Sequence, residues 1–217
     1  MMVLAVAGIL TGLLLPVLAQ VRENVHQVIS ASNLRQIALG ITMYARDHRD
    51  RLPYSALLAE KGEPLELMAA NVGETPGDWD GFGLLYAGGY ADTAEVFYCP
   101  SNRGQHSYER YLHDWRWPLY RRIYTNYHYC GHVTWDTQMR RRLEAGDGLV
   151  LAADGFRTAE DLNHENGFNV VRADGSVLWL EKMDDLAEGL PRNMSAETSI
   201  DIEEISELWN SIEKWSR

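Results

Sequence analysis

The first fifty residues constrain the fold of this chain more than any other stretch. No charged side chain occurs from Met1 to Ala19, and a helix needs about 20 apolar residues to cross a bilayer. Beyond this run, apolar residues recur at the spacing of an amphipathic helix: Val21, Val25, Val28, Ile29, Leu34, Ile37, Ile41 and Tyr44. We therefore expect one long helix with a transmembrane half, residues 1–21, and an amphipathic half with its exit turn, residues 22–52.

A cleaved signal peptide is the alternative interpretation of the same stretch. Its apolar region would normally have about 7–15 residues, after a basic start and before a small-residue cleavage site. Here the start is not basic, the apolar run is longer, and the helical pattern continues through Leu18-Ala19-Gln20. We therefore favour an anchor, with a kink at Pro16, because membrane helices tolerate proline.

The remaining residues suffice for a single domain of ordinary size. We place an extracytoplasmic globular domain at residues 53–184 and an acidic tail at 185–217. The net charge of −11 argues against a nucleic-acid partner, because phosphate binding is carried by Lys and Arg.

The chain has two cysteines, Cys99 and Cys130. A domain outside the cytoplasm favours a disulfide between them, since disulfides persist in oxidising compartments. Two alternatives stay open. The thiols could be unpaired, or they could form a zinc site with His128 and His132, although the spacing does not match common zinc motifs.

Short apolar runs predict strands in the second half of the domain, which gives an α+β fold with a small antiparallel sheet. Asp174-Gly175 between two such runs predicts a hairpin whose two turn residues both have positive φ. The tail, from about Glu197 to Trp215, has the apolar spacing of an amphipathic helix. The predicted strands are Val96–Cys99, Leu149–Asp154, Phe168–Ala173 and Ser176–Leu180.

Aromatic residues are dense in the middle of the chain. Exposed rings could stack on sugar faces, in which case Trp115 and Trp117 would belong to a glycan-binding platform. We favour packing over the sheet, because Tyr and Trp suit half-buried positions. The aromatic residues are Tyr108, Tyr111, Trp115, Trp117, Tyr120, Tyr124, Tyr127, Tyr129 and Trp135.

Three polar residues could converge at one edge of the sheet: Asp154 at the end of a strand, His164 before the hairpin and Asp174 in its turn. Two carboxylates and an imidazole could hold a divalent cation, and the carboxylates would suit calcium better than zinc. The structural alternative is that Asp174 makes the turn and that His164 pins a loop by a hydrogen bond. We favour the structural alternative and expect no catalytic residue.

Several segments together resemble one protein family. Leu13–Glu23 (LLLPVLAQVRE), Ser32–Gly40 (SNLRQIALG) and Cys99-Pro100-Ser101 are similar to segments of type IV pilin-like proteins and type II secretion pseudopilins. His164 and Asp174-Gly175 are similar to the H-x9-DG signature of a planctomycete-type group with a prepilin-type N-terminus. The resemblance covers the N-terminal helix, the Cys-Pro-Ser strand, the strand end at Asp154 and the hairpin with Asp174-Gly175, but not the acidic tail.

The resemblance implies a pilin-like fold, in which the long N-terminal helix packs on the sheet. It also implies a single-pass protein of the bacterial inner membrane, with its domain in the periplasm or at the cell surface, and the assembly machinery and other pilin-like subunits as partners. The basic leader and the glutamate of that family would fall before Met1. We expect either that the true start lies upstream or that this member has lost processing. Without the glutamate, assembly would be impaired, or this member would cap a filament rather than propagate it.

The function expected from the sequence is therefore structural, and not enzymatic: a subunit that joins a secretion or pilus-type filament through its N-terminal helix. One rival is a non-assembling, membrane-tethered module that binds a glycan or protein ligand. The other is a metal-dependent hydrolase that uses Asp154, His164 and Asp174.

Overall fold

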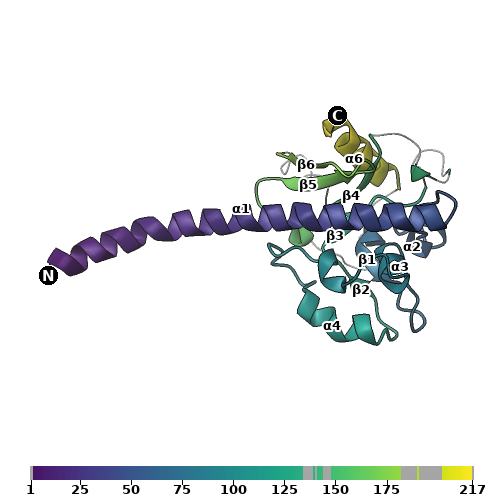
Figure 1. Cartoon of the computed structure of the whole chain (residues 1–217), viewed down its shortest axis with the longest axis horizontal. Coiled ribbons are helices and arrows are strands. Elements are labelled where there is room, and N and C mark those ends of the chain that lie inside the picture. The colour runs from purple at the N-terminus through teal and green to yellow at the C-terminus, as the bar shows by residue number, and fades with distance from the viewer. Residues whose placement is uncertain are drawn as a thin grey trace.

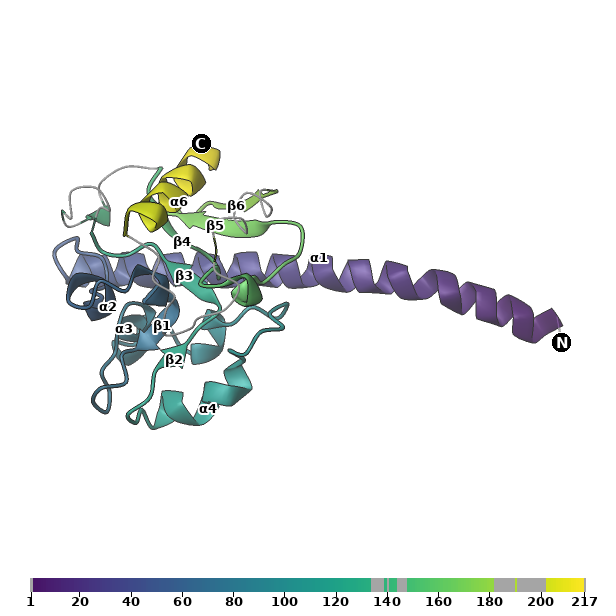
Figure 2. The same cartoon turned by 180° about the vertical axis from the view of Figure 1, so that it is seen from behind.

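The structure, a computed structural model, describes residues 2–133, 139, 141–143, 148–181, 190 and 202–216. Its longest element is α1 (Met2–Asp47), a single helix that continues through Pro16. Figures 1 and 2 show gentle curvature in its N-terminal half, where the sequence predicts a kink. The C-terminal half of α1 packs on the domain, and the N-terminal half extends away from it (Figure 1).

The docked half of α1 follows the predicted amphipathic pattern. Leu34, Ile37 and Ile41 have almost no exposed surface and belong to the main core. The same apolar series is exposed closer to the N-terminus, at Val21, Val25 and Val28. The predicted stripe is therefore continuous in sequence, but the domain covers only its second part.

The domain contains a four-stranded antiparallel sheet with the order β3-β4-β5-β6, whose strands are β3 (Tyr127–Tyr129), β4 (Val150–Asp154), β5 (Phe168–Arg172) and β6 (Val177–Leu180). A two-stranded sheet pairs β1 (Ala69–Asn71) with β2 (Ile123–Tyr124). The long N-terminal helix and these small antiparallel sheets confirm the α+β class. The predicted strands at 149–154, 168–173 and 176–180 are confirmed within a residue or two.

Helices cover both faces of the four-stranded sheet. Figures 1 and 2 place α1 in front of the sheet in one view and α6 (Ile202–Trp215) in front of it in the opposite view. All five residues of β4 are buried, as expected for a strand covered on both faces. The predicted tail helix is confirmed over 202–215, while Glu197–Asp201 lies outside the described residues.

The rest of the domain consists of short helices that pack aromatic side chains together. Trp115 stacks on Trp79 and Phe97, with ring centroids 5.5 Å apart in both pairs. Trp115 is thus a core residue, and its predicted alternative role in a glycan platform is wrong; Trp135 lies outside the described residues. The short helices are α2 (Ala56–Ala59), α3 (Phe82–Ala87), α4 (Tyr108–Arg116), and the 3-10 helices η1 (Pro64–Met68), η2 (Ala94–Phe97) and η4 (Ala159–Asp161).

Two local predictions are wrong for identifiable reasons. The run Val96–Cys99 is not a strand, because Thr93 accepts a hydrogen bond from the Glu95 N–H and begins the 3-10 helix η2. In the β5–β6 hairpin only Gly175 has positive φ, at 80°. The Gly175 N–H bonds to the Arg172 carbonyl, and the turn is a three-residue loop with one left-handed position.

The predicted transmembrane segment is also wrong. In the part of the chain that the structure describes, no helix combines the length and the apolar character needed to cross a membrane. Gln20, Arg22 and Glu23 end the apolar stretch of α1, whereas a crossing takes about 20 consecutive apolar residues. This finding overturns the predicted transmembrane half, 1–21, and the predicted single-pass location in the inner membrane.

Docking of α6 is testable with two tryptophans of opposite exposure. Trp209 is 1% exposed, and its ring lies 5.0 Å from that of Phe156, whereas Trp117 is 66% exposed. We expect Trp209→Ala to lower the free energy of unfolding by about 3–5 kcal/mol through lost burial and a cavity. Trp117→Ala should change it by less than about 0.5 kcal/mol. Urea unfolding followed by circular dichroism measures both, and equal effects would contradict this packing.

Candidate functional site

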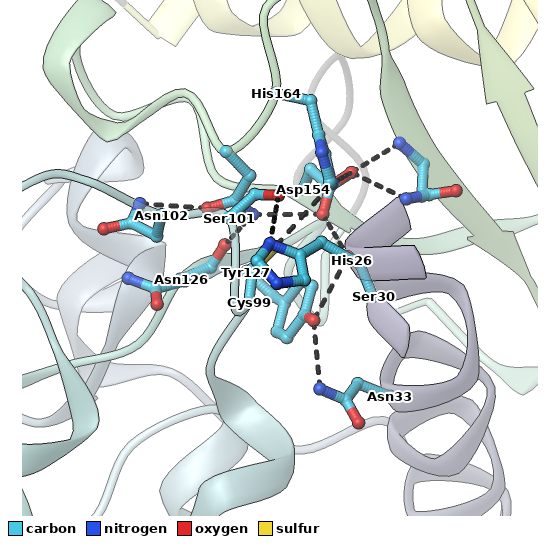
Figure 3. Close-up of polar contacts among 12 residues, drawn as sticks. His26, Ser30, Asn33, Cys99, Ser101, Asn102, Asn126, Tyr127, Asp154 and His164 are labelled. Atoms are coloured by element: carbon cyan, nitrogen blue, oxygen red, sulfur yellow. Dashed lines mark hydrogen bonds and ion pairs between the residues drawn. The ribbon is translucent and has the colours of Figure 1, made fainter. Parts of the chain in front are cut away.

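A cluster of polar side chains lies where α1 crosses the end of the four-stranded sheet (Figure 3). α1 contributes Glu23, His26 and Ser30 to this cluster. The domain contributes residues that are far away in sequence, among them Cys99, Ser101, Tyr127, Asp154 and His164. We refer to these eight residues as the junction cluster, because they connect α1 to the domain.

Asp154 is the centre of the junction cluster. It is the last residue of β4, is 1% exposed, and accepts four hydrogen bonds. Its Oδ1 accepts from Ser30 Oγ at 2.7 Å and from Asn163 Nδ2 at 3.0 Å. Its Oδ2 accepts from the backbone N–H of Asn169 at 2.6 Å and from its side-chain amide at 3.0 Å. These bonds provide the compensation that a buried carboxylate requires.

The residue after Asp154 is a glycine for a steric reason. A Cβ at Gly155 would lie 2.8 Å from the Asn126 carbonyl oxygen, which is closer than real Cβ contacts come. The Gly155 N–H donates to that same oxygen. A glycine therefore lets the chain pass close to Asn126 directly after Asp154, whose side chain bonds to Ser30 of α1.

His164 connects the cluster to α1 through both nitrogens of its ring. Nδ1 lies 2.5 Å from Oε1 of Glu23, and Nε2 lies 3.6 Å from Cys99 Sγ and 3.7 Å from Asp154 Oδ2. Burial would raise the pKa of Glu23, but hydrogen bonds from His164 and Ser101 outweigh it and lower that pKa. Glu23 is therefore a carboxylate at neutral pH, and it accepts a hydrogen bond from the N–H at Nδ1 of His164.

Cys99 lies just after η2 and is buried. Burial, together with the nearby Asp154 carboxylate, raises the pKa of its thiol to about 12. Cys99, His164 and Glu23 follow one another in contact, as the nucleophile, base and carboxylate of a catalytic triad do. A buried and protonated thiol is nevertheless a poor nucleophile.

The predicted disulfide is wrong, because Cys99 and Cys130 are not bonded to each other. Cys99 belongs to the junction cluster, whereas Cys130 follows β3 and lies against Arg141. The alternative zinc set is not assembled either. His128 stacks on Phe156 and bonds to the Pro64 carbonyl.

Asp174 stands apart from the junction cluster. The Ser176 side chain and the Ser176 backbone N–H both lower the pKa of Asp174. The N–H donates to the Asp174 carboxylate at 2.8 Å and stabilises the turn before β6. The predicted metal set of Asp154, His164 and Asp174 is therefore wrong in its third member. Within the described residues, the potential metal ligands that converge are Cys99, Asp154 and His164, whose ligand atoms all lie within 4.8 Å of one another.

The sequence analysis missed the contribution of α1 to the cluster. Glu23, His26, Ser30 and Asn33 follow one another at steps of three and four, and they continue the buried stripe of Leu34 and Ile37 towards the N-terminus. Polar residues at core spacing are the available signal, because such side chains need partners when they are buried.

The N-terminal part of α1 is the second feature of functional interest. Every residue from Leu14 to Val21 is exposed, and most of them are apolar. We refer to Leu14–Val21 as the uncovered segment. Among the elements that the structure describes, Figures 1 and 2 show no helix or strand beside the N-terminal half of α1, and only Ala19 and Gln20 of the uncovered segment line a hollow with loops of the domain.

Comparisons of the chain with protein-family models, with curated proteins and with solved structures found no match. The comparisons therefore do not identify a pilin-like family, and that resemblance remains a prediction from the sequence.

The different roles of the two aspartates are testable by matched substitutions. In Asp154→Asn, an amide donor replaces an oxygen that accepts two hydrogen bonds. Each bond to a charged group contributes about 1.5–3 kcal/mol, so we expect a loss of about 3 kcal/mol or more in the free energy of unfolding. Asp174→Asn should cost less than about 0.5 kcal/mol, since Asn also suits exposed turns. Urea titrations would contradict this assignment if the two variants were equally stable.

Proposed function

We propose that this protein is a non-catalytic structural subunit, which assembles with further copies of itself through the uncovered segment of α1. The observation that carries the proposal is the exposure of Leu14, Leu15, Val17 and Leu18 on a helix that its own domain leaves uncovered. Exposed apolar surfaces of this kind mark sites of association.

The distribution of these side chains favours several neighbours over a single one. A helix turns by about 100° per residue, so Leu14, Leu15 and Val17 point in three directions around its axis. A groove on one partner would cover only one of these directions. A helix that is apolar on all sides is normally buried on all sides, and a bundle of like helices provides such burial.

The sequence resemblance supports the same proposal. In pilin-like proteins the apolar halves of the N-terminal helices bundle into a filament, and the globular domains lie outside. Here a docked half of α1 holds the domain and an uncovered half points away from it (Figure 1). In such an assembly, the junction cluster would hold each domain in a fixed position relative to the helix bundle.

A charge in the uncovered segment tests this proposal. Leu18 and Leu39 are both 60% exposed, but Leu39 lies on the docked half of α1. We expect Leu18→Glu to raise the apparent dissociation constant of the assembly by at least about 30-fold, because each copy loses about 2 kcal/mol of apolar burial. Sedimentation velocity of the full chain over a range of concentrations, with electron microscopy of the same samples, provides the measurement.

Leu39→Glu is the matched control, and it should assemble like the unchanged protein. Two outcomes would contradict the proposal. The unchanged chain could sediment as a monomer at every concentration, or Leu18→Glu could leave the size distribution unchanged.

A further inference from the structure

We propose that Cys99, Asp154 and His164 bind one divalent transition-metal ion of the zinc type, with Glu23 of α1 as the residue that orients His164. The three side chains come from three separate segments: the turn after η2, the end of β4 and the loop before β5. All three are buried, with exposures of 4%, 1% and 5%. Figure 3 shows them together next to α1.

Two distances between the ligand atoms, both from His164 Nε2, fit a single ion. Zinc bonds to sulfur at about 2.3 Å and to nitrogen at about 2.0 Å, so at a tetrahedral angle the two ligand atoms are about 3.5 Å apart. Cys99 Sγ and His164 Nε2 are 3.6 Å apart. Nε2 and Asp154 Oδ2 are 3.7 Å apart, a separation that zinc bonds of about 2.0–2.2 Å span with a slightly wider angle.

The second ring nitrogen of His164 has the partner that a metal ligand needs. Metal-binding histidines almost always donate their other N–H to a carboxylate, a carbonyl or a water, which fixes the tautomer and the direction of the ring. His164 Nδ1 lies 2.5 Å from the Glu23 carboxylate. With the proton on Nδ1, the lone pair of Nε2 points towards Cys99 and Asp154.

The Cys99 sulfur faces the same ring nitrogen, since Sγ lies beside His164 Nε2. A cysteine binds a metal ion as the thiolate. The binding step is therefore an exchange in which the Cys99 S–H bond breaks, a sulfur–metal bond forms and one proton leaves to solvent.

The ligand types select the class of metal. A thiolate and an imidazole favour zinc and related transition metals, whereas calcium takes six to eight oxygen ligands. Three protein ligands leave a fourth position, which a water molecule completes. Asp154 would supply Oδ2, the oxygen near His164 Nε2. Oδ2 also accepts hydrogen bonds from the backbone N–H and the side-chain amide of Asn169, so the Asn169 side chain must turn away when the ion binds.

Cobalt(II) is a suitable probe, because it replaces zinc and gives visible bands in tetrahedral sites and a near-ultraviolet charge-transfer band with thiolate. The full chain would be treated with a chelator, dialysed and titrated with Co²⁺, and Zn²⁺ would then be added. We expect one ion per chain, a thiolate band that zinc abolishes, and a higher melting temperature with zinc, since binding to the folded state stabilises it.

Cys130→Ser is the matched control for Cys99→Ser, because both cysteines are buried and only Cys99 lies in the cluster. The thiolate band should vanish in Cys99→Ser and persist in Cys130→Ser. Glu23→Gln changes a partly exposed residue outside the core, and it should weaken Co²⁺ binding by about 10–100-fold without changing the stoichiometry.

Three results would overturn the proposal. The unchanged chain could show no thiolate band at millimolar Co²⁺, Cys99→Ser could retain the band, or Cys130→Ser could abolish it. The first result requires no variant, so it is decisive even if Cys99→Ser does not fold. The test is independent of self-assembly, because it can be made on the Leu18→Glu variant as well.

Discussion

The buried carboxylate of Asp154 is the interaction on which the rest of the structure depends. A charge with 1% exposure is tolerated only when donors surround it, and here the donors come from α1, β5 and the loop before β5. Each donor can be present only if its own element is in place. The carboxylate therefore favours one arrangement of helix, strand and loop over other compact packings of the same apolar residues. The apolar core supplies most of the free energy of folding. The hydrogen bonds of Asp154 determine how α1, β5 and the loop before β5 are placed relative to β4.

The parts of the fold that depend on local pattern could be predicted from the sequence. The three-and-four spacing along α1, the apolar run ending at Asp154 and the Asp-Gly hairpin each specify an element through neighbouring residues. The junction cluster could be predicted only in part. Asp154 and His164 stood out by residue type, but Ser30 lies 124 positions from its partner, and no local rule makes such a pairing. The prediction of a disulfide was wrong for the same reason. The sequence does not show that Cys99 and Cys130 contact different parts of the domain.

The division of α1 into two halves gives a single helix two different environments. From Ser30 onwards its apolar face is part of the domain core, and towards the N-terminus the same helix lies exposed. Glu23 and His26 stand at the boundary and bond to Ser101. The boundary between the two halves is thus marked by polar contacts, which are directional, as well as by the end of the apolar core contacts.

The order of synthesis has a consequence for the docked half of α1. Its apolar face leaves the ribosome first, but it packs against β4 and β5, whose residues follow more than a hundred positions later. At about 5–20 residues per second, the 124 residues between Ser30 and Asp154 take roughly 6–25 s to translate. During this interval α1 lacks the strands β4 and β5, although α3 and η2, which also pack on it, are synthesised earlier. The docked half of α1 can therefore complete its packing only late in translation, when β4 and β5 have emerged.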